Sequence, residues 1–202
     1  INSNDPKAYA GSLSLYGLNI SDDFTFCGSM AVSKGLNINS GGSLTISENL
    51  TNNGSLVVNS GASLIVNGNS SGNITYKRNL PAVNKWYLVA SPFTGETLQN
   101  IITNHSFATG TPPNIGLAPY NNTELDSNKR WNYQTVNATG SFNNGQGYSA
   151  RLASPGEISF TGTANTTDIS VPITAITQNA YNLVGNPYSS FINSATFLTN
   201  NS

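Results

Sequence analysis

The sequence predicts an all-β protein in which a short parallel β-solenoid is followed by an antiparallel β-sandwich. Three observations lead to this fold class: an internal repeat early in the chain, a set of longer aromatic strands after it, and a composition rich in turn-forming residues. Charged residues make up 8% of the 202 residues, against about 25% in typical globular proteins. Asn, Ser, Thr and Gly supply the polarity instead, as expected for short strands joined by turns.

The repeat is the strongest of these signals. Residues 36–46 return about 20 residues later as residues 56–66, and each copy has two pairs of aliphatic residues separated by an Asn-Ser-Gly turn. Alternate side chains of a strand share one face, and no single coil buries its apolar face alone. We therefore expect these pairs to line the common interior of stacked coils: Leu36/Ile38, Leu44/Ile46, Leu56/Val58 and Leu64/Val66.

Short strands precede this repeat, and a change of pattern follows it. Residues 12–15, 18–20 and 24–26 are short alternating runs that we interpret as the first coils, with a capping role. The repeat stops at the basic pair before Pro81, and proline is expected to end the strand there. This change of pattern predicts two domains, a solenoid with its N-terminal cap at 1–78 and a sandwich-like module at 79–202.

The second domain is predicted to contain about seven strands. They are expected at residues 86–90, 117–120, 130–133, 147–151, 158–160, 169–173 and 181–184. One short helix is expected at residues 97–104, where Leu98, Ile101 and Ile102 have helical spacing.

The order of motifs in the second domain resembles large surface proteins of Bacteroidetes such as flavobacteria. The resemblance covers most of residues 76–193 and is carried by Trp-Tyr-Leu-Val-Ala-Ser-Pro-Phe at 86–93, Gly-Gln-Gly-Tyr at 145–148, Phe-Thr-Gly-Thr at 160–163 and Gly-Asn-Pro-Tyr at 185–188. It implies export by the type IX secretion machinery and a place outside the cell or on the outer-membrane surface. The C-terminal sorting domain of such proteins is not present in residues 79–202. The resemblance implies no particular activity.

Composition excludes several classes of partner and site. A net charge of −1 gives no electrostatic attraction to nucleic acid or anionic lipid, and no apolar run reaches the length of about 18 residues that a transmembrane helix needs. Cys27 is the only cysteine, so metal–thiolate clusters and intrachain disulfides are excluded. We expect it to be a small buried hydrophobe beside Phe24 and Phe26.

Catalytic arrangements find little support in the sequence. His105 is the only histidine and is expected in a surface loop, so a Ser-His-Asp arrangement has a single candidate base. Glycoside hydrolysis needs only two carboxylates across a cleft. Most of the acids, including Glu96, fall at predicted turns or strand ends, where solvated carboxylates are expected. We therefore predict no catalytic residues and no cofactor.

Two binding sites remain as candidates. Oxygen-bearing side chains alternate at Asn122, Glu124, Asp126 and Asn128, so Glu124, Asp126 and Asn128 are a weak calcium candidate. The glycine of an EF-hand loop is absent. The preferred interpretation is a polar hairpin tip between Tyr120 and Trp131. Exposed aromatic rings that stack on sugars are the second candidate. This set comprises Trp86, Tyr120 and Trp131, with Tyr133 and Tyr148 as further members. Aromatic residues in strands usually belong to the core, and this is the preferred interpretation for all five.

These observations favour a non-enzymatic extracellular surface protein, an adhesin or cell-envelope stalk that contacts a glycan or a protein. The alternative is the accessory glycan-binding part of a secreted polysaccharide-degrading enzyme. In either case aromatic contacts are expected to dominate binding, and binding to a neutral polysaccharide is expected to persist in high salt because charges are sparse.

Overall fold

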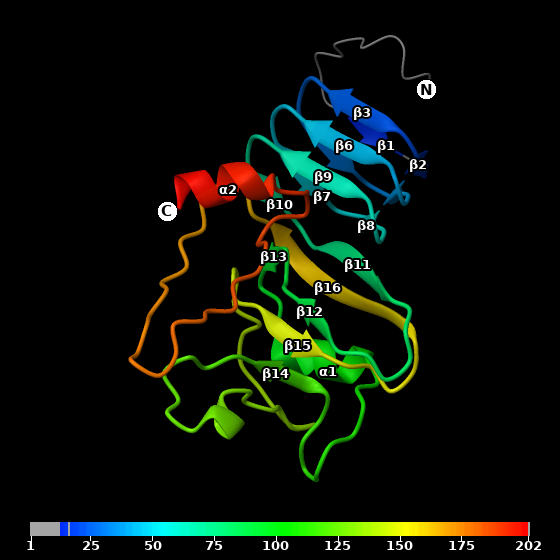
Figure 1. Ribbon diagram of the computed structural model, residues 1–202. Coiled ribbons are helices and arrows are strands. Elements are labelled where there is room, and N and C mark those ends of the chain that lie inside the picture. The colour runs from blue at the N-terminus through cyan, green and yellow to red at the C-terminus, as the bar shows by residue number, and fades with distance from the viewer. Residues whose placement is uncertain (1–12, 16, 202) are drawn as a thin grey trace.

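The computed structural model describes residues 13–15 and 17–201 and is mostly β, with two short α-helices. Parallel strands stack at the N-terminal side, and antiparallel strands, helix α1 and long irregular segments follow (Figure 1). No helix in the described part of the chain is long and apolar enough to cross a membrane.

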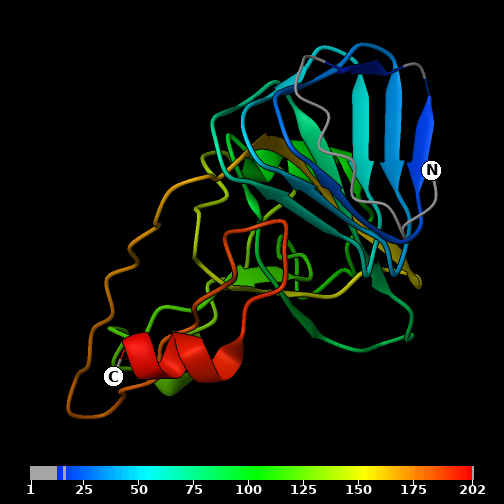
Figure 2. The same cartoon turned by 90° about the horizontal axis from the view of Figure 1, so that it is seen from above.

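Three columns of parallel strands form the N-terminal half, which we call the strand stack. Figure 2 shows the molecule from above, with strands of successive coils lying side by side. The first column holds β1 (Leu13–Leu15), β4 (Met30–Val32), β7 (Leu50–Asn52) and β10 (Ser70–Ser71). The second holds β2 (Leu18–Ile20), β5 (Gly35–Ile38), β8 (Ser55–Val58) and β11 (Ile74–Leu80). The third holds β3 (Asp23–Phe26), β6 (Ser43–Ile46) and β9 (Ser63–Val66).

The register of the stack is the one that the repeat predicts. Strand β5 pairs with β8 so that Leu36 lies opposite Leu56, and β6 pairs with β9 so that Leu44 lies opposite Leu64. All eight predicted interior residues are buried, which confirms this part of the sequence analysis. The turns between them place Gly41 and Gly61 at φ angles of 85° and 82°, a region that side chains disfavour.

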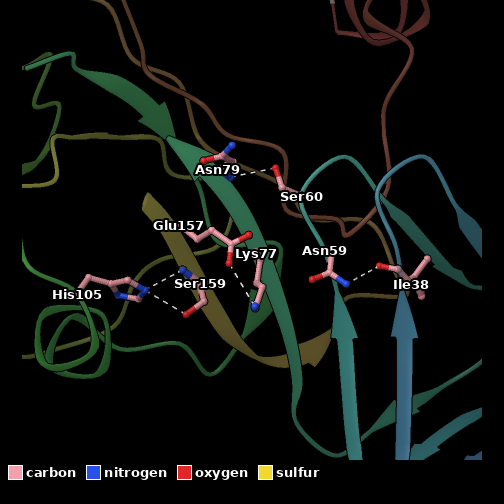
Figure 3. Close-up of polar contacts among 8 residues, drawn as sticks. All are labelled: Ile38, Asn59, Ser60, Lys77, Asn79, His105, Glu157 and Ser159. Carbon is pink, nitrogen blue, oxygen red and sulfur yellow. Dashed lines mark hydrogen bonds and ion pairs between the residues drawn. The ribbon is translucent and has the colours of Figure 1, made fainter. Parts of the chain in front are cut away.

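Side-chain ladders tie neighbouring coils together. Asn37 donates to the Asn19 side chain at 3.2 Å. Asn59 donates to the Ile38 carbonyl at 3.0 Å, as Figure 3 shows. Each of these bonds joins one coil to the coil before it, so polar side chains add to the register that the aliphatic residues define.

Cys27 does not occupy the predicted core position, because it is exposed. Phe26 before it is 1% exposed. Successive side chains of a strand point to opposite faces, so the residue after an inward Phe26 faces solvent.

Strand β11 joins the stack to the rest of the molecule. Its first half pairs in parallel with β8, and its whole length pairs antiparallel with β16 (Gly156–Ala164). Strand β13 (Phe93–Thr94) extends the sheet on the far side of β16. Strand β11 ends at Leu80, directly before Pro81, as predicted. The predicted division at residues 78/79 falls inside this continuous strand and stays a prediction.

A second antiparallel sheet and helix α1 complete the ordered part. The sheet contains β12 (Tyr87–Val89), β15 (Tyr148–Ala150) and β14 (Leu117–Pro119). Helix α1 (Leu98–Asn104) lies where a helix was expected, and the hydroxyl of Thr97 caps it by accepting the Asn100 N–H at 3.1 Å. A 3₁₀ turn (Ser127–Lys129) and helix α2 (Ser194–Asn200) follow later in the chain.

Three strands expected from the sequence are wrong. Residues 130–133 and 181–184 form only isolated bridges, at Trp131 and Val184, and residues 169–173 are irregular. Pro172 lacks the N–H that a central strand needs. Beyond it, the Asn182 side chain accepts the Thr174 N–H at 3.1 Å and donates to the Thr174 carbonyl at 2.8 Å, in place of a neighbouring strand.

Candidate functional site

The aromatic residues expected to bind sugar do not form one platform. Tyr148 is 2% exposed and stacks on Phe142 with ring centroids 3.8 Å apart, so it belongs to the core; burial also raises the pKa of its hydroxyl above the usual 10.0. Tyr120 and Trp131 pack edge to face on each other at 5.0 Å. Trp86 lies with Tyr133 instead, and their ring centroids are 5.9 Å apart.

Trp86 and Tyr133 line a surface groove of about 250 Å³ that we call the Trp86 groove. Both rings are partly open to solvent, at 44% and 41% exposure. The other lining residues are Ala108, Thr109, Gly110, Thr111, Asn114, Ile115, Gly116 and Arg151. The groove therefore combines two partly exposed aromatic residues with small and polar side chains.

Strand register brings the groove together. Tyr87 lies opposite Ala150 in the β12–β15 pair, so the flanking residues Trp86 and Arg151 become neighbours across the sheet. The guanidinium carbon of Arg151 lies 6.0 Å from the centre of the Trp86 ring, within the range of a cation–π contact. Neither the contact of Arg151 with Trp86 nor that of Tyr133 with Trp86 can be predicted from the sequence, because only the fold brings these distant residues together.

The calcium candidate is a hairpin tip, as preferred from the sequence. A bridge between Tyr120 and Trp131 closes it. Inside it, the Glu124 carboxylate accepts the Asp126 N–H at 3.0 Å, and the Asp126 carboxylate accepts the Asn128 N–H at 3.0 Å.

The carboxylates of this hairpin tip point to local donors rather than to a shared centre. Asp126 also pairs with Lys129 at 3.4 Å, and Asn122 turns away to bond with Thr174. The hydrogen bond from the Asn128 N–H is the main reason why the pKa of Asp126 is lowered from 3.8. Within the described residues, no group of three or more His, Cys, Asp or Glu side chains is arranged to hold a metal ion.

His105 is not in a free surface loop, which corrects the sequence-based expectation. It caps the C-terminus of α1 and is partly buried against β16. Its Nδ1 lies 2.9 Å from the Ile101 carbonyl, and its Nε2 accepts the Ser159 N–H at 2.9 Å (Figure 3). These partners require the neutral tautomer with the proton on Nδ1.

The Ser159 hydroxyl also lies 3.1 Å from His105 Nε2, the distance of a nucleophile–base pair. Here, however, Nε2 already accepts a backbone N–H, and the third partner is a backbone carbonyl rather than a carboxylate. This arrangement fastens α1 to β16. Beside it, Lys77 and Glu157 form an ion pair at 3.2 Å between β11 and β16 (Figure 3).

Glu96 was expected to be a solvated carboxylate at a turn or strand end, and this expectation is wrong. Its side chain is buried, with 2% of the residue exposed. One oxygen accepts the Thr97 N–H at 2.9 Å and the Asn100 amide at 2.8 Å, and the other accepts the Thr161 N–H at 2.5 Å. Three donors compensate the cost of burying the charge. Glu96 thus holds the start of α1 against β16.

The Gly-Asn-Pro-Tyr motif at residues 185–188 forms a structural turn. The Asn186 side chain accepts the Tyr188 N–H at 3.0 Å and donates to the Ser190 carbonyl at 2.7 Å. This turn places Ser189 beside the outer edge of β9. There the Ser189 carbonyl accepts the Leu64 N–H at 2.8 Å, and its hydroxyl donates to the Leu64 carbonyl at 3.0 Å. We call residues 185–190 the cap segment.

Comparison with known proteins identifies a family and no relative of known activity. No curated protein matches the chain, and no solved structure matches it. The family described as Domain of unknown function (DUF8693) matches residues 18–202, and the chain belongs to this family.

Proposed function

We propose that this chain is a non-enzymatic extracellular surface protein, an adhesin or cell-envelope stalk segment whose solenoid ends in a sandwich-like, ligand-presenting module. Export by the type IX secretion machinery is part of the proposal and rests on the resemblance of residues 76–193 to Bacteroidetes surface proteins. In this proposal the strand stack is the spacer and the Trp86 groove is the contact surface.

The observation that carries the proposal is the way in which the stack ends. A parallel stack exposes unpaired backbone groups at its last coil, and such edges promote aggregation. Here β16 covers β11, and the cap segment covers β9 through Leu64. A regular stack in which two of the three columns are covered at their C-terminal edge suits a projecting spacer that must stay soluble.

The glycan-binding part of a secreted polysaccharide-degrading enzyme is the second candidate. The Trp86 groove favours it, because two partly exposed rings beside polar side chains are suited to stacking on a sugar. Both candidates assign the same contact surface, and they differ in the domains that the complete gene encodes. A hydrolase domain in that gene supports the second candidate, whereas further repeats support the first.

Two measurements test the proposal. Purified protein is incubated with plant and algal polysaccharides, and reducing ends and unsaturated products are measured; we expect no excess over a heat-killed control. Product formation that disappears when one carboxylate is replaced would refute the non-enzymatic function. In the second measurement, protease added to intact cells of the source is expected to degrade the protein, and cells without type IX export are expected to retain it inside.

A further inference from the structure

The Trp86 groove contains a guanidinium group without a carboxylate partner. Arg151 donates to the Asn84 side chain at 2.8 Å. Its Nε lies buried with no hydrogen-bond partner in the described structure. The ion pairs found among the described residues are Lys77–Glu157 and Lys129–Asp126, so Arg151 is in neither of them.

The groove also lacks negative charge. None of its lining residues is acidic, and the exposed Lys85 precedes Trp86 in the chain. The chain has 9 acidic and 8 basic residues, whereas the lining of the groove has Arg151 and no acid, so its lining carries a positive charge. A partly buried guanidinium is weakly hydrated and binds planar anions in a bidentate geometry.

Size and shape limit what fits beside it. The groove, at about 250 Å³, is smaller than the range of roughly 300–1,000 Å³ typical of sites for drug-sized ligands. One sugar unit of a longer polymer matches this space better than a complete oligosaccharide. Thr109, Thr111 and Asn114 supply hydroxyl and amide groups to its lining, and such groups hydrogen-bond to sugar hydroxyls.

We propose that the Trp86 groove binds an acidic sugar unit of a polysaccharide, with the ring against Trp86 and Tyr133 and the carboxylate on Arg151. This inference rests on the proposed glycan contact and names the class of glycan. The sequence composition led us to expect a neutral polysaccharide as the ligand. We now propose an acidic one, because the charge at the groove governs binding more than the net charge of the chain does. Binding should therefore weaken as salt rises.

The test compares polygalacturonate with the same polymer after methyl esterification, which masks the carboxylates and keeps the backbone. Binding to the full chain is measured by affinity gel electrophoresis and calorimetry at low and high salt. We expect the acid form to bind about tenfold more tightly than the ester, the difference that one charge-assisted contact supplies.

Variants assign the effect to the groove. Arg151→Gln is expected to remove the preference for the acid form, and Arg151→Lys to retain part of it. Trp86→Ala is expected to abolish binding of both forms. Lys34→Gln, in an exposed turn of the strand stack, is the matched control because it removes the same charge elsewhere. Melting curves establish that each variant is folded. Tyr133→Ala, also expected to weaken binding of both forms, replaces Trp86→Ala if that variant does not fold, and Arg151→Lys replaces Arg151→Gln.

The possible results separate the two proposals. Equal binding of acid and ester, or equal loss in Arg151→Gln and Lys34→Gln, would overturn the acidic-sugar assignment and leave a glycan contact in place. Failure of every acidic and neutral polysaccharide to bind would overturn both the assignment and the proposed glycan contact.

Discussion

Glu96 shows how much a single buried side chain contributes to the C-terminal half. Glu96→Ala removes an acceptor that serves three donors, two of them backbone N–H groups, and leaves these donors unsatisfied. We expect the free energy of unfolding to fall by about 2–4 kcal/mol, measured by urea denaturation. Glu48→Ala is the control, because Glu48 is exposed and accepts one hydroxyl, that of Ser29. Similar losses in the two variants would contradict this role of Glu96.

The hairpin tip at residues 121–130 supports a second prediction at the same scale. Calcium would have to displace the N–H donors and Lys129 that already occupy the carboxylates of Glu124 and Asp126. We therefore expect chelator treatment to leave the melting temperature nearly unchanged. A large drop on chelation that Asp126→Ala abolishes would contradict this expectation.

Individual residues also define how far sequence reasoning extends. Leu64 was placed correctly because its repeat partner Leu44 is visible in the chain. Glu96 was placed wrongly, because Thr161, whose N–H it accepts, lies 65 residues away in the sequence. The same holds for Trp86, whose neighbour Arg151 follows from the β12–β15 register alone. Periodic contacts are therefore readable from the sequence, whereas contacts between distant, non-repeating strands need the fold.

At the scale of elements, the cap segment is where the strand stack meets the irregular C-terminal region. Asn186→Ala removes both side-chain hydrogen bonds of the turn that positions Ser189. We expect a loss of about 1 kcal/mol in stability. Amide exchange at Leu64 should become roughly tenfold faster, because local opening frees its N–H.

The control for the cap segment is Asn201→Ala, which also removes an asparagine side-chain bond, the one at the end of α2. It should leave exchange at Leu64 unchanged. An Asn186→Ala variant with wild-type exchange at Leu64 would mean that β9 does not depend on the cap segment.

Elements of the C-terminal region were predicted less well than those of the stack, for a physical reason. Asparagine side chains replace backbone pairing at several points, as Asn182 does beside Thr174 and Asn165 does at the Pro187 carbonyl. Alternating apolar residues then predict strands that the backbone does not form. The β-sandwich accordingly stays a prediction, while four antiparallel pairings are present in the described part of the chain: β11–β16, β13–β16, β12–β15 and β14–β15.

At the scale of the whole molecule, one continuous core runs from the strand stack into the C-terminal half. Buried residues from Ile20 in the stack to Phe160 in β16 belong to the same cluster. A defect in the stack is therefore expected to destabilise the whole chain rather than one end. Loss of structure should be observed together at Trp86 and Trp131 by fluorescence and in the strands by circular dichroism.

Leu64→Asp provides the decisive test of this architecture. Leu64 is 2% exposed and lies opposite Leu44, so the variant places an unpaired carboxylate in a dry interior. We expect a cost of several kcal/mol, on the order of other buried-charge defects, and a single cooperative transition at a lower temperature. Leu125→Asp is the matched control, because Leu125 is 70% exposed and should tolerate the same change. A Leu64→Asp variant that melts within about two degrees of the parent would exclude a packed stack, because a shift this small corresponds to less than about 1 kcal/mol in a chain of this size.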